Sequence, residues 1–164
     1  MDVMLARYLR GATAGLLATA PMTAVMFALH RRLPWWQKTP VPPEQITSRV
    51  LRTVGLKKLD QKAHEPVTWL SHFGYGAAGG GLYPLADRLM RALPLSAALK
   101  GMIFGVLIWA GSYLGWLPAV DLMAPATEHP SERNIMMIAA HLAWGASLGA
   151  LYDSWNGDSQ RTVG

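Results

Sequence analysis

Four segments of the chain contain no charged residue, and polar loops separate them. They cover residues 11–29, 67–86, 101–120 and 134–152, and each is 19 or 20 residues long. A helix needs about 20 mainly apolar residues to cross the hydrocarbon core of a bilayer. A helix on the surface of a soluble domain carries charges on its outer face instead. The pattern therefore predicts four transmembrane helices, with a buried helical bundle of a soluble protein as the alternative.

The second and fourth uncharged segments share one sequence pattern. His72-Phe-Gly-Tyr-Gly-Ala-Ala-Gly-Gly-Gly-Leu-Tyr83 recurs in outline 69 residues later as His141-Leu-Ala-Trp-Gly-Ala-Ser-Leu-Gly-Ala-Leu-Tyr152. A weaker echo aligns Gly11 with Gly101. A repeat at a fixed offset indicates one structural unit used twice. We therefore expect an all-α, four-helix transmembrane bundle built from two parallel helical-hairpin repeats, related by an axis along the membrane normal.

The long loop after the first segment contains the pattern of one more helix, at residues 43–56. Glu44 follows two prolines, which is typical of a helix start. Ile46, Val50 and Val54 recur every fourth residue, and polar residues occupy the other faces. This pattern predicts a short amphipathic helix that either lies on the membrane surface or packs on the protein's own loops.

Small residues four positions apart occur in all four predicted spans. Such pairs form a groove on one helix face, and the groove lets a neighbouring backbone approach closely. Close packing of this kind tightens the fold of a monomer, or forms a homodimer or a contact with another membrane protein. The predicted helix-packing pairs are Gly11 and Gly15, Gly76 and Gly80, Gly101 and Gly105, Gly111 and Gly115, and Gly145 and Gly149.

Two histidines at equivalent positions of the repeat are the main candidates for chemistry. His72 and His141 are expected at the same depth in the membrane, where an ionisable residue is costly and indicates function by default. Imidazole there can ligate a haem iron or another metal, handle protons or substrate, or only bond neighbouring helices. The candidate intramembrane polar site comprises His72, His141, Tyr75, Trp144, Ser112 and Tyr113.

A second group of histidines and acids lies in the polar loops. Imidazole and carboxylate together can bind zinc or respond to pH. No two of these residues have a fixed helical spacing on one element, so the sequence favours a local role at the starts of the spans over a metal site. The candidate ligands of this loop cluster are His30, His64, His129 and Glu128.

Composition narrows the possible functions of this single 164-residue domain. Only 15% of the residues are charged, the net charge is +5, and cysteine is absent. Disulfides and thiolate metal sites are therefore excluded, and the basic loops suit anionic lipid headgroups. No basic-aromatic motif indicates nucleic-acid binding, and neither a phosphate-binding loop nor a serine elbow is present. The sequence thus favours a non-enzymatic protein in a lipid bilayer.

Several motifs together resemble those of one protein family. These are Ala20-Pro-Met-Thr23, Leu33-Pro34 to Pro42-Pro-Glu44, His72-Phe-Gly-Tyr-Gly-Ala77, Gly111-Ser-Tyr-Leu-Gly-Trp116, Ala126-Thr-Glu-His-Pro130 and His141-Leu-Ala-Trp-Gly145. The set is similar to that of the YagU-like family, which consists of bacterial inner-membrane proteins of unknown function. The resemblance implies a multi-pass protein of the inner membrane, and it supplies no activity, cofactor or catalytic residue.

Three functional hypotheses follow from the sequence. The first is a small membrane component or partner subunit without enzymatic activity. The second is a redox protein that binds haem or a metal through His72 and His141. The third is a small transporter or proton-handling bundle that uses the same two histidines.

Overall fold

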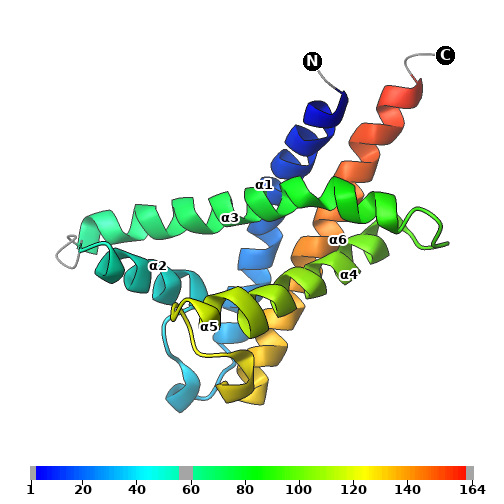
Figure 1. Ribbon diagram of the computed structural model, residues 1–164. Helices are drawn as coiled ribbons and strands as arrows, with labels where there is room; N and C mark the ends of the chain where they lie inside the picture. The colour runs from blue at the N-terminus through cyan, green and yellow to red at the C-terminus, as the bar shows by residue number, and fades with distance from the viewer. Residues whose placement is uncertain (1–2, 56–60, 162–164) are drawn as a thin grey trace.

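The computed structural model describes residues 3–55 and 61–161, and the regular elements in these ranges are all helical. The prediction of an all-α chain is confirmed for this part. Four long helices form most of the molecule (Figure 1): α1 (Val3–His30), α3 (Gln61–Leu89), α4 (Ala97–Ala110) and α6 (Ser131–Arg161). The shorter elements are the 3-10 helices η1 (Trp35–Gln37) and η3 (Ala126–Glu128), α2 (Pro42–Thr53), the π-helical η2 (Gly111–Trp116) and α5 (Leu117–Ala119).

The predicted spans 11–29, 67–86 and 134–152 lie inside longer helices, and the span 101–120 coincides with helical residues up to Ala119. α1 begins at Val3 and α6 continues to Arg161, both well outside the uncharged segments. α4, η2 and α5 follow one another directly and form one helical rod, whose start is capped by the Ser96 hydroxyl, which accepts a hydrogen bond from the Leu99 amide at 3.3 Å. Absence of charge marks the part of a helix that suits lipid, whereas the helix itself continues into polar surroundings.

Two of the long helices, α3 and α4, lie across the other two, α1 and α6 (Figure 1). α1 packs against α3 and α6, and α4 packs against α6, whereas α3 and α4 have little contact with each other. Figure 1 shows α3 and α4 lying across α1 and α6, with the Val3 end of α1 beside the Arg161 end of α6. Space therefore remains between α3 and the C-terminal part of the rod, and α2 lies against α3 beside it.

Glycines form the crossing of α1 with α3. A Cβ atom added at Gly15 would overlap the carbonyl oxygen of Gly76 and lie 2.7 Å from the Cα atom of Gly80. A Cβ atom added at Gly11 would overlap the carbonyl oxygen of Gly80. The two backbones therefore touch directly, which the predicted small-residue pairs on both helices allow.

Glycines form the crossing of α4 with α6 in the same way. A Cβ atom added at Gly101 would overlap the carbonyl oxygen of Gly145 and lie 3.0 Å from the Cα atom of Gly149. A Cβ atom added at Gly105 would overlap the carbonyl oxygen of His141. Gly101 thus makes the contact with α6 that Gly15 makes with α3. The sequence echo aligned Gly101 with Gly11 instead, so the structural equivalence is shifted from the sequence alignment by one helical turn.

The fifth predicted glycine pair does not pack within the described chain. Cβ atoms added at Gly111 and Gly115 would meet no atom within 4 Å, because no described element covers this face of η2. Of the two roles expected for such pairs, Gly111 and Gly115 do not pack helices together within the described chain, and a contact between chains stays a prediction.

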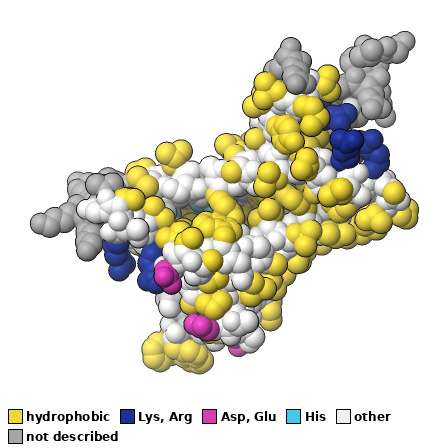
Figure 2. Space-filling view, in the orientation of Figure 1, with side chains coloured by type: hydrophobic (Ala, Val, Ile, Leu, Met, Phe, Trp, Pro, Cys, Tyr) yellow, Lys and Arg dark blue, Asp and Glu magenta, His cyan; other side chains and the backbone are white. Residues whose placement is uncertain are grey.

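Three of the long helical segments are long and apolar enough to cross a membrane: α1, the rod Ala97–Ala119 and residues Ser131–Asn156 of α6. α3 has the length but is less apolar, because glycine and polar side chains interrupt its uncharged segment. Large hydrophobic side chains nevertheless project outward from the long helices, and Figure 2 shows hydrophobic surface over much of the visible face. These features fit a small membrane protein.

The predicted surface helix is present as α2, and it packs against the protein. Pro42 and Thr47 are buried, and α2 lies against α3. Of the predicted apolar stripe, only Ile46 packs on the core, whereas Val50 and Val54 are exposed. Residue 56, the last one of the predicted helix, lies outside the described residues.

Candidate functional site

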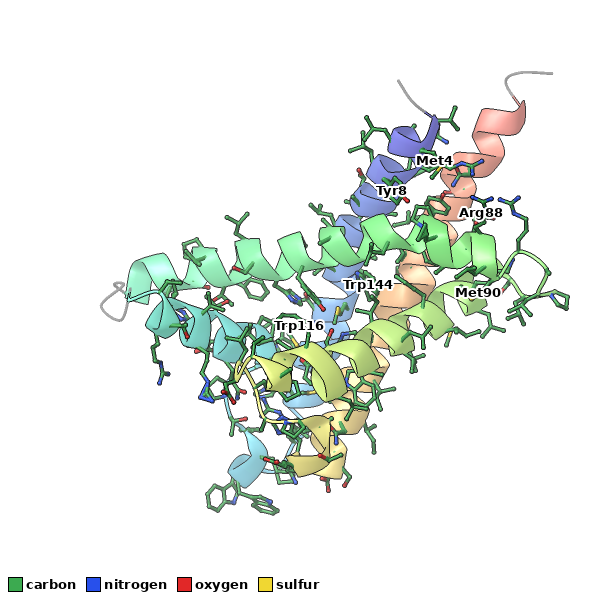
Figure 3. All side chains as sticks on the ribbon, in the orientation of Figure 1. Met4, Tyr8, Arg88, Met90, Trp116 and Trp144 are labelled. Atoms are coloured by element: carbon green, nitrogen blue, oxygen red, sulfur yellow. The ribbon has the colours of Figure 1, made fainter. Side chains whose placement is uncertain are left out.

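A cavity of about 190 Å³ lies between α1, α2, α3, the α4–α5 rod and α6. Trp116 from η2 and Trp144 from α6, both labelled in Figure 3, contribute to its wall below α3. The structure brings all six residues of the candidate polar site to this one cavity: His72, Tyr75, Ser112, Tyr113, His141 and Trp144. The sequence pattern placed them on three different segments, and the helix crossings bring those segments together.

The hydrogen bonds of His72 define its tautomer. The Thr23 hydroxyl donates its only proton to the Thr19 carbonyl at 2.7 Å. The same hydroxyl oxygen lies 3.0 Å from His72 Nε2, so Nε2 carries a proton and donates it. In the neutral ring, Nδ1 of His72 then has the free lone pair. The rings of Trp69 and Phe73 lie next to the imidazole, with centroids at 6.2 and 5.9 Å.

The hydrogen bond of His141 defines the opposite tautomer. Nδ1 lies 2.8 Å from the Met137 carbonyl, which can only accept, so Nδ1 is the protonated atom. Nε2 then has the lone pair, and it has no hydrogen-bond partner among the described residues. Protein does not cover Nε2 completely, and His141 is one of the residues that line the cavity. The ring itself is 4% exposed and meets the Tyr113 ring edge to face.

A chain of hydrogen bonds joins α3 to η2 at the cavity wall. The Ser112 hydroxyl donates to the Ile108 carbonyl at 2.7 Å, so the Tyr75 hydroxyl donates to Ser112 Oγ at 2.6 Å. The indole of Trp116 donates to the Tyr75 oxygen at 3.3 Å. Every donor in this chain has an acceptor, and the chain fixes the positions of Tyr75 and Ser112 where α3 and the rod otherwise have little contact.

Trp144 joins α6 to α1. Its indole Nε1 donates to the Gly15 carbonyl at 3.0 Å, and the Thr19 hydroxyl donates to the same oxygen at 2.9 Å. Its ring stacks on Phe104, with centroids 6.0 Å apart. The Gly15 carbonyl oxygen therefore accepts hydrogen bonds from both α6 and its own helix.

Other residues of the cavity wall were not predicted as part of a site. Met22, Met26 and Met137 contribute thioether side chains, and Thr47 and Ile46 come from α2. Met22 and Met26 are four residues apart, so both lie on one face of α1. This spacing is visible in the sequence and could have indicated a shared role. The contribution of α2 depends on how the long loop folds back, and no local pattern predicts that.

The predicted loop cluster does not assemble as a metal site. Among residues 3–55 and 61–161, no group of three or more His, Cys, Asp or Glu residues could hold a metal ion together. His30 instead bonds the Thr39 carbonyl at 3.0 Å, and His64 bonds the Ser48 hydroxyl at 2.9 Å. Within the described residues His30, His64, His129 and Glu128 therefore form no shared metal site, and His30 and His64 make separate local contacts.

Arg133, in the first turn of α6, is buried although its side chain is charged. It is 6% exposed, and its guanidinium donates to the Thr39 hydroxyl and to the Pro40 carbonyl at 3.3 Å. His129 lies four residues before Arg133 in the chain. The pKa of the His129 imidazole is lowered mainly by burial and then by the nearby positive charge of Arg133. These contacts attach the 35–45 loop to the start of α6.

The family comparison gives one match. A family model covers residues 5–163, nearly the whole chain. The chain belongs to DUF6789, a family of unknown function. No curated protein and no solved structure matched the chain. The family match names no activity, so the site carries the functional argument, and the relationship to YagU-like proteins stays a prediction from the motifs.

Proposed function

We propose that this DUF6789 protein spans the membrane four times and binds a small polar ligand or ion in the cavity at His72 and His141. In this proposal it is a non-enzymatic membrane component. The observation that carries the proposal is the convergence of six polar and aromatic residues from α3, η2 and α6 on one cavity. Such polar groups inside a membrane protein are costly, and they mark a site of binding or transport.

Two features support α3 as the fourth span. Its segment 67–86 is uncharged, and Leu70 and Leu82 project outward with 75% and 56% of their surfaces exposed. Gly76 and Gly80 of α3 also contact α1 in the same way as Gly145 and Gly149 of α6 contact α4. A duplicated hairpin with equivalent glycine crossings accounts for both facts, and it places α3 in the same environment as α6.

The size of the cavity favours a small ligand. The cavity volume of about 190 Å³ is well above the ~10–15 Å³ that a single water molecule needs. Sites for drug-sized ligands and cofactors occupy about 300–1,000 Å³, which is more than this cavity offers. The cavity therefore suits an ion, a few waters or a compact solute better than the haem considered from the sequence.

Cysteine labelling tests whether the cavity can be reached from water. The chain has no cysteine, so each single-cysteine variant reports on one position. Thr47→Cys, in the cavity wall, should react with a membrane-impermeant thiol reagent, and a ligand that fills the cavity should slow the reaction. Ala140→Cys is the control, because Ala140 is fully buried and is not in the wall. If Thr47→Cys reacted with the thiol reagent as slowly as Ala140→Cys, the cavity could not be reached from water and the proposal would be contradicted.

Proton handling is the second candidate function. The lone pairs of His72 Nδ1 and His141 Nε2, assigned from their hydrogen bonds, leave both rings able to accept a proton at the cavity. In sealed proteoliposomes, a pH gradient should then dissipate faster with the native protein than with His141→Ala. Equal rates for the two proteins would exclude a proton pathway through this residue.

The proposed location is the inner membrane of a bacterium, as the resemblance to YagU-like proteins implies. A homodimer, or a complex with another membrane protein, would use outward faces such as that of Gly111 and Gly115. Analytical ultracentrifugation in detergent, with and without Gly111→Leu, measures whether this face holds two chains together. An unchanged sedimentation coefficient would exclude this glycine as a dimer contact.

A further inference from the structure

Three thioether side chains line the cavity together with the two imidazoles. Met22 and Met26 come from successive turns of α1, and Met137 comes from the turn of α6 that precedes His141. All three are almost completely buried, with exposed fractions of 8%, 0% and 3%. Methionine also fills irregular space in ordinary cores, so the thioethers alone do not indicate a ligand.

The two imidazoles supply the second observation. Thr23 engages Nε2 of His72, and the Met137 carbonyl engages Nδ1 of His141. Each neutral ring therefore leaves its other nitrogen as a free donor atom for a metal. Metal-ligating histidines usually donate their second N–H to a protein oxygen, and this bond fixes the tautomer and the ring orientation. Both rings have such a bond.

The charge of this cavity selects among metals. Its wall contains no carboxylate and no cysteine, so every available ligand is neutral. A divalent ion would leave two uncompensated charges in a region of low dielectric constant, whereas a monovalent ion leaves one. Thioethers are soft ligands, which select Cu(I) among the biological metals, and imidazole also binds copper.

We propose that His72, His141 and the thioethers of Met22, Met26 and Met137 form a site for a soft monovalent metal ion, Cu(I). The proposal rests on the proposed function, which makes this cavity a ligand site, and it names the ligand class. The ion binds through imidazole nitrogen and thioether sulfur, with no change in oxidation state at the protein. The same ligand set binds Ag(I), a soft monovalent ion that needs no reductant.

Silver titration of the full-length protein in detergent tests the site. The probe is Ag(I) as its nitrate in chloride-free buffer, followed by calorimetry and by metal analysis after desalting. We expect one tightly bound ion per chain, and competition by Cu(I) delivered under anaerobic reducing conditions. Zn(II) should bind at least about tenfold more weakly, because the cavity offers it no anionic ligand.

Two methionines that are neighbours in the chain provide a matched pair of variants. Met136 and Met137 are both buried, at 2% and 3% exposure, but only Met137 lines the cavity. Leucine has nearly the volume of methionine, so Met136→Leu and Met137→Leu should perturb packing to a similar extent. Met137→Leu should weaken Ag(I) binding by more than about tenfold, since even an outer-shell change weakens metal binding about that much. Met136→Leu should leave the affinity unchanged.

The histidines complete the test. His141→Ala should abolish Ag(I) binding, whereas His30→Ala, which changes a half-buried histidine outside the cavity, should retain it. Circular dichroism and the size-exclusion profile establish that each variant is folded. If His141→Ala does not fold, the methionine pair still decides the question.

Three outcomes would overturn the proposal. They are no Ag(I) or Cu(I) binding by the folded protein, equal effects of the two methionine changes, and preference for Zn(II). None of them bears on whether Thr47→Cys is reached from water, so failure of the metal proposal is distinguishable from failure of the proposed ligand cavity.

Discussion

The substitution Gly145→Ala tests how α4 and α6 are held together at their crossing. A Cβ atom at this position would overlap the carbonyl oxygen of Gly101, lie 2.7 Å from its carbonyl carbon and 3.1 Å from the Cα atom of Met102. Carbon atoms make their best contact at about 3.5–4.0 Å. All three neighbours are backbone atoms, so no side chain can rotate away, and α4 and α6 have to separate.

The expected free-energy change follows from two opposing effects. Overpacking of a tight contact costs about 1–3 kcal/mol, and the upper end applies where only backbone can move. Alanine in place of glycine inside a helix returns about 1 kcal/mol. The net destabilisation is then about 2 kcal/mol, which lowers the folded-to-unfolded ratio about thirtyfold.

The assay is the loss of helical circular dichroism during titration with sodium dodecyl sulfate. Gly111→Ala is the matched control, because its added methyl group meets no atom within 4 Å. It should leave stability unchanged or raise it by up to about 1 kcal/mol. Direct backbone contact at the α4–α6 crossing would be refuted if Gly145→Ala were no more destabilising than Gly111→Ala.

Further predictions concern single polar contacts. Ser112→Ala removes the acceptor of the Tyr75 hydroxyl and should lower the free energy of unfolding by about 1 kcal/mol in the same titration; no loss would mean that this bond does not form. Trp144→Phe should cost about 1 kcal/mol more than Trp109→Phe, because both changes shrink a packed ring but only the first removes a hydrogen bond, since the indole N–H of Trp109 has no partner among the described residues. Burial lowers the pKa of His129 below its ordinary value, so the unfolded chain binds the extra proton first and stability should fall as the pH drops below about 6.5. His129→Gln should flatten that dependence in thermal unfolding curves recorded from pH 7.5 to about 5, and an unchanged slope would contradict it.

Local chemistry made much of the fold predictable from the sequence. The absence of charge over residues 67–86 marked a long helix because charged groups cannot be buried in lipid cheaply. Gly76 and Gly80 indicated a close crossing because only glycine lets two backbones touch. Both properties belong to a few neighbouring residues, so they are visible without knowledge of the tertiary structure.

The remaining features depend on how distant segments meet. Gly111 and Gly115 have the same spacing as the packed pairs, and only the position of η2 leaves their face uncovered. Met137 and Met136 are equivalent in the sequence, and helix rotation alone decides which one lines the cavity. The burial of Arg133 likewise follows from the return of the 35–45 loop onto α6.

The central claim is that α3 lies in the membrane with the other long helices, around a cavity reached from water. Labelling of Leu70→Cys in proteoliposomes, with a membrane-impermeant thiol reagent on both sides, tests it most directly. Leu70 projects outward from α3 and Val54 projects from the end of α2, with exposed fractions of 75% and 61%. The account predicts rapid labelling of Val54→Cys and none of Leu70→Cys, because lipid covers α3. Equally rapid labelling of both positions would place α3 in water and contradict a four-span protein.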